Sequence, residues 1–313
     1  MGLTGLEENR LKLILFGGKG GVGKTTCASS TGIRLSKDFK TLIFSTDPAH
    51  SLADSLGENI GDEVKEVNSI KNLSVLQISA EKAFSKFKID YESQIKKILD
   101  TSTYLDEQDI EAVFDLPIPG IDEVMGFKTI VDLIDEAKFD KYIVDTAPTG
   151  HALRLLTLPE LLDDWIKVMA KMRWKYRYMV TSFGGKYKPD EGDDFLLEMK
   201  KTVKRIECLL RDSQRCEFVA VTIPEDMAIL ETERLINTLS RYGIKVRQLV
   251  VNNVLESGDC KFCTERREGQ RRYVNLIREK FSSLKVTIVP LQAQEVKGLD
   301  GLNNFKDLLF RAD

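Results

Sequence analysis

The sequence lacks any long apolar run. No stretch of its 313 residues approaches the ~18 apolar residues that a membrane-spanning helix needs. The segment from Met1 to Glu8 also lacks the basic and apolar regions of a signal peptide. A net charge of −3 favours neither nucleic acid nor an anionic membrane as a partner. We therefore expect a cytoplasmic protein that binds no nucleic acid.

Cysteine is scarce, since the chain has five cysteines, an odd number and too few for a disulfide framework. Cys27, Cys208 and Cys216 lie in apolar segments and are expected to be small buried residues. Only Cys260 and Cys263 are close in sequence. This pair supplies half of a tetrahedral zinc site, and a two-fold axis between two chains would supply the other half. A redox dithiol and two idle thiols are the alternatives.

The most informative segment that is present begins with the apolar run Leu13 to Phe16. It leads into a match to the phosphate-binding consensus of glycine, four residues, glycine, lysine and serine or threonine. Glycines let backbone N–H groups point at a phosphate, while Lys24 is expected to contact the β- and γ-phosphates and Thr25 to bind Mg²⁺. The expected nucleotide-binding residues are Gly18, Lys19, Gly20, Gly21, Val22, Gly23, Lys24, Thr25 and Thr26.

Lys19 is unusual in such a loop, because the loop turns this side chain away from its own phosphates. It is either a solvated surface lysine or a group that reaches a phosphate bound by a second subunit. The segment Gly18 to Thr26 resembles the loop of the deviant P-loop ATPases, a family of ATP-dependent dimers. That resemblance favours the contact with the second subunit.

Apolar segments of strand length alternate with segments of helix length along the chain. The expected strands after the first are residues 41–45, 73–78, 142–145, 218–223, 246–251 and 286–289. This pattern predicts an α/β fold, a P-loop NTPase with a mostly parallel sheet flanked by helices. We find no internal repeat, which indicates a single ATPase unit.

Two segments with helical periodicity interrupt the alternation. Phe84, Phe87, Tyr91, Ile95 and Ile98 recur at steps of three and four in the first, and the second is expected to be helical from Pro159 to about Met179. We therefore expect an inserted α-helical subdomain of residues 81–137 and 155–213. The ATPase domain would comprise residues 1–80, 138–154 and 214–313.

Two aspartates follow predicted strands. Asp47 is placed to orient an attacking water, and Asp145 suits the Mg²⁺-side role of a Walker B aspartate, although either position also suits an ordinary helix N-cap. The two histidines, His50 and His151, each follow one of these aspartates within a few residues. We interpret them as orienting the loops near the γ-phosphate.

Several ordered motifs resemble one family. The stretches Gly18–Thr26, Ser45–Ser51, Asp145–His151 and Cys260–Cys263 are similar to those of the arsenite-pump-type ATPases. They resemble more closely the targeting ATPases of the guided entry of tail-anchored proteins pathway. Residues 119–123, 231–235 and 251–252 strengthen the match, which runs from about residue 13 to 305.

The resemblance implies an ATP-hydrolysing homodimer that closes around two ATP molecules. It assigns Asp47 to activating the water, with Lys24 and Lys19 as further catalytic residues. It places around the nucleoside Glu225, Asn252, Pro290, Leu291, Gln292, Ala293, Gln294, Glu295, Val296 and Lys297. The corresponding switch II segment is Asp145, Thr146, Ala147, Pro148, Thr149, Gly150 and His151. Ser51 stands where some relatives have asparagine.

In these families the helical insertions of two subunits form an apolar groove for the transmembrane helix of a tail-anchored protein, which is then delivered to the membrane. The expected groove residues are Met169, Met172, Tyr176 and Met179, with Phe84, Phe87 and Ile121. The alternative is that this stripe forms the core of a helical lid. A membrane receptor is a further expected partner.

Two other functions compete with targeting. An arsenite or antimonite efflux pump needs thiolates for the metalloid, but no cysteine lies between Cys27 and Cys208, and the tandem duplication of such pumps is missing. An iron–sulfur cluster carrier would use the pair Cys260 and Cys263 to bridge a cluster, but it needs no long amphipathic insertions. Targeting of tail-anchored proteins is the favoured function, with ATP, Mg²⁺ and Zn²⁺ as cofactors.

Overall fold

The computed structural model describes residues 2–45, 51–78, 80–102, 121–146, 149–184, 186 and 188–311. It leaves out the side chains of residues 80–81, 83–84, 99–102, 121–127, 149–162 and 164–165. The chain forms two compact units. Unit 1 comprises Met1–Ser79, Asp132–Leu156 and Leu209–Asp313, and unit 2 comprises Ala80–Val131 and Thr157–Cys208.

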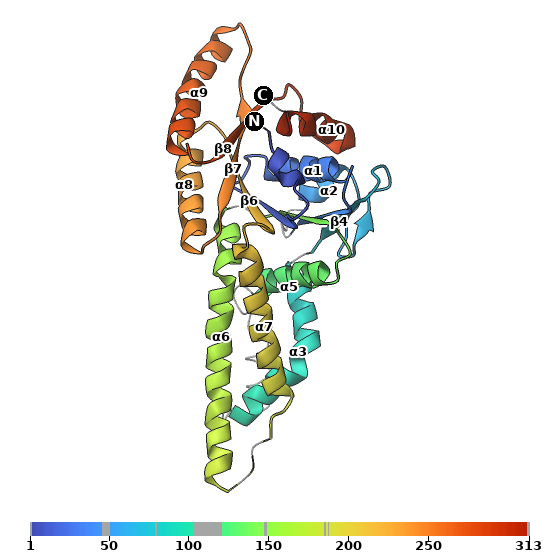
Figure 1. Ribbon diagram of the computed structural model, residues 1–313, viewed down its shortest axis with the longest axis vertical. Helices are drawn as coiled ribbons and strands as arrows, with labels where there is room; N and C mark the ends of the chain where they lie inside the picture. Colours follow the sequence, from blue (N-terminus) through green and yellow to red (C-terminus); the bar gives the residue numbers. More distant parts are fainter. Residues whose placement is uncertain are drawn as a thin grey trace. The chain divides into compact units, whose positions relative to one another are not determined.

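Unit 1 is built around an eight-stranded sheet, drawn as arrows in Figure 1. The strands are β1 (Leu13–Gly17), β2 (Thr41–Ser45), β3 (Lys65–Glu66), β4 (Leu73–Gln77), β5 (Lys141–Asp145), β6 (Cys216–Thr222), β7 (Val246–Val254) and β8 (Lys285–Pro290). Their spatial order is β3-β4-β2-β5-β1-β6-β7-β8. Every neighbouring pair is parallel except β3 with β4. The predicted α/β fold with a mostly parallel sheet is therefore confirmed.

The helices connect these strands or form unit 2. Unit 1 holds the 3-10 helix η1 (Thr4–Glu7) and the helices α1 (Lys24–Leu35), α2 (Ser51–Leu56), α8 (Asp226–Arg241), α9 (Lys261–Lys280) and α10 (Gly298–Leu309). The other helices are α3 (Ala80–Ser102), α5 (Ile121–Asp135), α6 (Thr149–Ser182) and α7 (Glu191–Arg211). Among the described residues, no helix is both long and apolar enough to cross a membrane.

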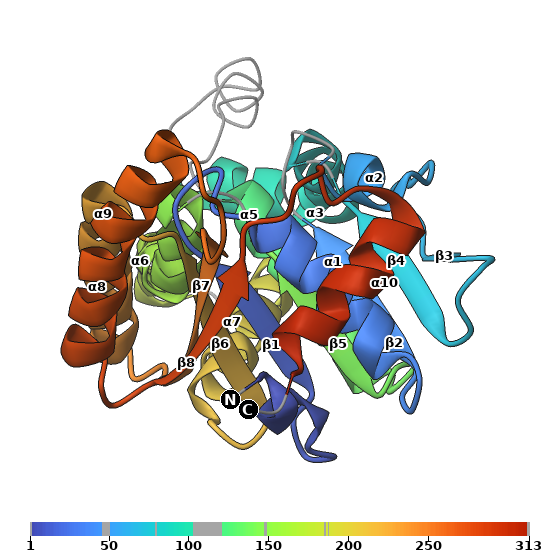
Figure 2. The same cartoon turned by 90° about the horizontal axis from the view of Figure 1, so that it is seen from above.

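Helices cover both faces of the sheet in the part formed by β6 and β7. In β6, Val219 and Val221 belong to a core cluster with residues of α1 and α10, whereas Ala220 packs with Ile229 of α8 and Ile277 of α9. Figure 2 shows the two pairs of helices on opposite sides of the strands. Burial on both faces explains why the strands appear in the sequence as continuous apolar runs rather than as alternating patterns.

The strand register aligns the ends that carry function. Phe16 of β1 and Ser45 of β2 both pair with Asp145 of β5. The segments that follow these three neighbouring strands therefore leave the sheet at the same edge. In open parallel sheets this carboxyl edge is where ligands bind.

Unit 2 has an aromatic cluster between α3 and α7. Phe87 and Phe195 are each 2% exposed, and Tyr91 lies between them with ring centroids 5.2 Å and 4.9 Å away. The Tyr91 hydroxyl donates a hydrogen bond to Glu198 of α7 over 3.2 Å. The predicted helical stripe is thus buried at Phe87, and this contact joins the two helices into one core.

A buried arginine fixes the start of α7. Arg173 of α6 is 3% exposed and forms ion pairs with Asp190 and with Asp193, the latter over 3.0 Å. Asp190 accepts a hydrogen bond from the Gly192 amide, and Asp193 accepts one from the Asp190 amide, which together form a reciprocal capping box. Burial opposes ionisation of Asp190, but the hydrogen bond and charge of Arg173 lower its pKa below the ordinary value.

Two predictions about local structure are wrong. The helix expected to start at Pro159 already begins at Thr149, so that Pro159 lies inside α6. Cys208, expected to be buried in an apolar segment, is exposed on α7, while Cys27 and Cys216 are buried as predicted. Because α7 is amphipathic, apolar residues next to Cys208 in the sequence do not show that Cys208 itself faces the core.

Candidate functional site

The glycine-rich loop lies between β1 and α1, where the sequence predicts it. A Cβ atom at Gly18 would lie 2.1 Å from the Val221 carbonyl oxygen of β6, so no side chain fits there. Gly23 is the N-cap of α1 with a φ of 95°, a backbone conformation that favours glycine. A Cβ at Gly23 would also lie 2.4 Å from the Asn252 Nδ2 atom. Both consensus glycines are therefore required by close packing of the loop.

Lys24 is the first residue of α1 and is buried. Its ammonium donates a hydrogen bond over 3.1 Å to the carbonyl oxygen of Lys19, across the loop. The N-terminus of α1 lies at the same loop, and the N–H groups and dipole of a helix N-terminus favour an anion. This combination of a buried cation and a helix N-terminus is suited to bind phosphate.

A set of oxygen atoms lies beside the loop. The Thr25 hydroxyl donates to Asp145 Oδ2 over 2.8 Å, and Thr25 Oγ1 is 3.4 Å from the Ser51 hydroxyl oxygen. Asp145 is fully buried at the end of β5. Hydroxyl and carboxylate oxygens are the ligands that Mg²⁺ prefers, usually together with phosphate oxygens and water. Thr25 and Asp145 therefore fit a magnesium ion held between protein and nucleotide phosphates.

The residue after Asp145 also ties β5 to β1. The Thr146 hydroxyl donates to the Phe16 carbonyl oxygen over 2.7 Å. Thr149, Gly150 and His151 form the first residues of α6, of which the structure describes the backbone. The predicted positions Asp47, His50, Ala147 and Pro148 lie outside the described residues.

Asn252 links the loop to β7. It is 5% exposed and its Nδ2 donates to the Val22 carbonyl oxygen over 3.0 Å. Its Oδ1 is buried and has no hydrogen-bond partner within the described part of the chain. An unpaired buried acceptor is costly, so this oxygen is suited to accept a hydrogen bond from a ligand such as a nucleobase.

The other residues expected near the nucleoside follow neighbouring strands. Glu225 is the N-cap residue of α8, just after β6. Pro290 ends β8, and residues 291–296 lie between it and Lys297, the N-cap residue of α10. The Leu291 amide donates to the Val254 carbonyl oxygen over 2.8 Å, which fixes the start of this segment beside β7. The topology thus brings the carboxyl ends of β6, β7 and β8 to the edge that carries the loop.

Lys19 lies near an acidic residue of its own chain. Its Nζ is 3.9 Å from Glu231 Oε1 of α8, and both side chains are about one-third exposed or less. The sequence motif around Glu231 signals family resemblance but gives no reason to pair it with Lys19. In the single chain the ammonium therefore rests against α8 and not over the loop that binds phosphate.

The cysteine pair forms the start of α9. Cys260 is the N-cap residue, and its sulfur accepts a hydrogen bond from the Cys263 amide over 3.2 Å. The two Sγ atoms are 3.0 Å apart, well beyond the ~2.05 Å of a disulfide bond. Hydrogen bonds from the Cys263 side chain and amide lower the pKa of Cys260, while the pKa of Cys263 is raised by its bond to Cys260. The pair is accessible and adjacent, as a metal ligand pair must be.

The predicted groove residues on α6 differ in exposure. Met169 is buried at 4%, Met172 and Tyr176 are half-buried, and Met179 is exposed. The side chains of Phe84 and Ile121 lie outside the described residues, and Phe87 packs into the aromatic cluster. Met169 therefore packs within unit 2 of the single chain.

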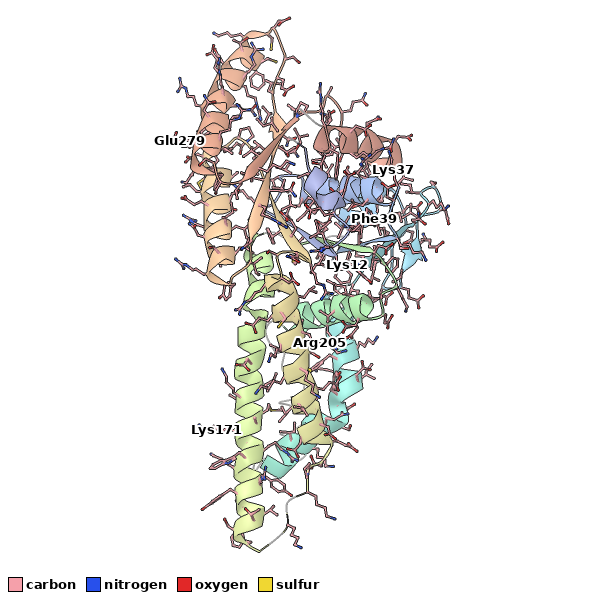
Figure 3. The ribbon with its side chains drawn as sticks, viewed as in Figure 1. Lys12, Lys37, Phe39, Lys171, Arg205 and Glu279 are labelled. Carbon is pink, nitrogen blue, oxygen red and sulfur yellow. The ribbon has the colours of Figure 1, made fainter. Side chains whose placement is uncertain are left out.

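Among the described side chains of α6 and the residue after it, Val168, Trp174, Tyr178 and Phe183 are the most exposed apolar ones, and none was predicted as a groove residue. We call the pair Trp174 and Tyr178 the aromatic face; they are 64% and 62% exposed, whereas Val168 and Phe183, which are 54% and 90% exposed, point in other directions. Trp174 and Tyr178 stack with ring centroids 5.9 Å apart. Their spacing of four residues along α6 would have revealed the pair. Lys171, labelled in Figure 3, lies on the same helix.

Comparisons with known proteins cover nearly the whole chain. The family profile described as anion-transporting ATPase matches residues 11–311. The chain is 36% identical to "ATPase ASNA1 homolog 1" of Paramecium tetraurelia over 98% of its length and 94% of that protein. It is 34% identical to "ATPase GET3B" of Arabidopsis thaliana, covering 98% and 80% of the two chains. It is 32% identical to "ATPase get3" of Neurospora crassa, covering 98% and 92%.

The geometry of Thr25 leads to a prediction about magnesium. Replacing Thr25 by valine removes the hydroxyl beside Asp145 but keeps the shape of the side chain. We expect the affinity for ATP in the presence of Mg²⁺ to fall at least about tenfold, because an oxygen ligand of the metal is lost. Affinity for ATP in excess chelator should change less than about threefold. Titration with a fluorescent ATP analogue measures both.

Thr31→Val is the matched control for this variant. Thr31 is also in α1 and fully buried, and its hydroxyl has no hydrogen-bond partner among the described residues. It should leave both affinities unchanged. An equal loss of affinity with and without Mg²⁺ in Thr25→Val would contradict the assignment.

Proposed function

Because this chain belongs to the anion-transporting ATPase family, we propose that it is an ATP-driven targeting factor that carries the transmembrane helix of a tail-anchored protein to a membrane. Family membership makes the chain an ATPase. The observation that supports the cargo is the aromatic face of unit 2. Trp174 and Tyr178 stack on each other and are 64% and 62% exposed in the single chain.

Exposure of large aromatic side chains has a physical cost. Soluble proteins rarely expose contiguous apolar patches beyond ~300–600 Å², and larger ones mark binding surfaces. A client helix of ~20 residues is ~30 Å long and ~10 Å in diameter. Covering half of its cylindrical surface therefore takes roughly 470 Å² of apolar protein surface. Stacked aromatic rings and the exposed Met179 offer such a helix a broad and adaptable surface.

A homodimer divides this surface between two chains. We propose that closure around two ATP molecules brings the two aromatic faces together, so that neither chain exposes the full groove alone. Lys19 then leaves Glu231 and contacts the phosphate bound by the partner. Asp47 activates the water in this proposal. Thr25 and Asp145 would hold a Mg²⁺ ion, which would neutralise charge on the phosphates. The proposed location is the cytoplasm, with a membrane receptor as the last partner.

The alternative functions have less support. A metalloid pump needs soft thiolates near the ATPase site. Cys27 is fully buried beside the loop, and its pKa is raised by burial and by the charge of Asp145, so it stays a protonated thiol. An iron–sulfur carrier would use Cys260 and Cys263, but that function does not explain why the side chains of the aromatic face are exposed.

Capture of a client tests the function directly. We expect Trp174→Ser combined with Tyr178→Ser to weaken binding of a tail-anchor peptide at least tenfold, since two aromatic contacts are lost. Basal ATPase activity and the melting temperature should stay close to wild type because both residues are exposed. ATPase activity is measured with Asp47 intact. For the capture assay, Asp47→Asn is added to both the reference chain and the variant, because it should bind ATP without turning it over. Fluorescence anisotropy of a labelled peptide gives the affinity.

The matched control for client capture replaces two exposed apolar side chains of unit 1 by serine. Met227 and Leu276 are 56% and 41% exposed, and their serine variants should leave capture unchanged. Undiminished capture by the Trp174 and Tyr178 variant would exclude the aromatic face as the binding surface. Persistent turnover in Asp47→Asn would remove that residue from its proposed role.

The cross-subunit role of Lys19 is tested with mixed dimers. One chain carries Lys19→Ala and the other carries Lys24→Ala. If Lys19 acts on the partner's nucleotide, both defects fall in one site and the other site stays intact, so about half of the wild-type turnover should remain. Turnover near zero would show that Lys19 acts within its own chain. Both homodimers of the single variants serve as inactive references.

We also propose that two copies of Cys260 and Cys263 hold one zinc ion between the subunits. Among the described residues, no group of three or more histidine, cysteine or acidic side chains gathers in one chain. A single chain therefore offers two ligands of the four that structural zinc requires. The short Sγ–Sγ separation and the exposure of the pair support a shared site.

Metal content and dimer affinity test the shared zinc site. The wild type should contain one zinc per two chains, and Cys260→Ser with Cys263→Ser should lose the metal and dissociate more readily. Cys208→Ser, a change at another exposed cysteine, should do neither. Metal analysis and sedimentation velocity provide the two measurements. One zinc per chain, or an unchanged dimer without zinc, would overturn this assignment.

A further inference from the structure

A pocket of about 550 Å³ opens at the amino ends of the strands in unit 1. Lys40 precedes β2, Asn72 precedes β4, and Lys138 and Phe139 precede β5. Its remaining wall comes from β3 and the turn that follows. Figure 2 shows β3 and β4 at one edge of the sheet. The strands are parallel and five residues long, so the pocket is separated from the phosphate loop by roughly 15 Å of sheet.

Backbone hydrogen bonds hold the walls of this pocket in place. The Asp140 amide donates to the Lys40 carbonyl oxygen over 2.7 Å, and Asp140 Oδ2 accepts from the Lys40 amide over 3.0 Å. The Thr41 amide donates to the Asn72 carbonyl oxygen over 2.8 Å. Asn72 has a φ of 63°, and its side-chain amide donates to the Ser36 carbonyl oxygen over 3.3 Å. The pocket is therefore formed by fixed loops rather than by loose side chains.

The charges around the pocket are unbalanced. Among the lining residues, Lys40, Lys71 and Lys138 are cationic and Glu66 is the carboxylate, while the carboxylate of Asp140 accepts the Lys40 amide beside them. Lys138 has a partner, Glu136, at 2.6 Å. The side chains of Lys40 and Lys71 form no ion pair or hydrogen bond within the described part of the chain. Two ammonium groups thus remain available to a ligand, and they favour an anion.

The rest of the lining is mixed: Asn68, Asn72 and Ser74 are polar, and five residues are apolar. Val67 and Leu73 are buried, Ile70 and Phe139 are half-buried, and Val64 is 42% exposed. The nearby Lys141 cannot join the ligand, because its ammonium donates to the carbonyl oxygens of Glu8 and Leu11. It also lies over the ring of Phe39, a residue labelled in Figure 3. An inorganic ion would leave these apolar walls in contact with water.

We propose that this pocket binds a small organic anion, a carboxylate or phosphate attached to an apolar group. Lys40 and Lys71 hold the anionic group, and Val64, Ile70 and Phe139 contact the apolar group. The volume lies within the ~300–1,000 Å³ of ordinary small-molecule sites. The site is separate from the nucleotide edge, and the proposal does not depend on the targeting function.

The probe is 4-fluorobenzoate, which combines a carboxylate with an aromatic ring. Its binding is followed by ¹⁹F NMR on the full-length protein with Mg·ADP present, so that the phosphate loop is occupied. A probe of this size should saturate the site with a Kd on the order of millimolar. Lys40→Ala with Lys71→Ala should raise that Kd tenfold or more, because two charged contacts are lost.

The control variant is Lys200→Ala with Lys245→Ala, which changes the net charge equally at two exposed lysines elsewhere. It should leave the Kd within about twofold, as should Lys71→Arg, which keeps the cation. Equal weakening by the control pair would show a non-specific charge effect and would overturn the site.

Two further probes separate the parts of the ligand. The neutral isostere 4-fluorobenzamide should bind at least tenfold more weakly, and acetate should compete poorly because it has no ring. Benzamide binding as tightly as benzoate would overturn the role of the lysines. Acetate competing as well as benzoate itself would overturn the apolar contact. Absence of saturable binding up to about 50 mM would reject the pocket as a site for such anions.

Discussion

The hydrogen bond from Thr25 to Asp145 is the contact on which the nucleotide site depends. It joins the first turn of α1 to the end of β5, across 120 residues of sequence. A fully buried carboxylate is costly unless it is paired, and the hydroxyl of Thr25 pairs with one of its oxygens. The register that sets Phe16 opposite Asp145 brings the two elements within reach. Slippage of β1 against β5 would move Asp145 away from Thr25 and break this hydrogen bond.

The sheet and the loop could be predicted because their signals are local. Each central strand of unit 1 is a buried run of apolar residues that ends where polar residues begin, as in Leu42 to Ser45. The phosphate loop requires glycine for reasons of backbone conformation and close packing, so that Gly18 and Gly23 identify it without any knowledge of the fold. Asp145 was identified from its place after a strand, and the parallel topology then explains its approach to Thr25.

Other features depend on contacts that no short segment specifies. Pro159 favours the start of a helix in sequence, yet the helix continues on both sides of it. The apolar residues of α6 surround much of the helix, so their spacing could not separate Met169, which is buried, from Trp174, which is exposed. The contact of Lys19 with Glu231 and the anion pocket both join residues from separate elements. Their geometry follows only from the assembled sheet.

The short strand β3 has a consequence for how two chains associate. It contributes two residues, Lys65 and Glu66, to the edge beside β4, and Lys65 also binds the Asn59 carbonyl oxygen over 2.8 Å. Two charged residues paired antiparallel offer a poor template for a strand from another molecule. The sheet is thus protected against growth at this edge. A chain that exposes Trp174 and Tyr178 thereby avoids adding a second, edge-to-edge route to aggregation.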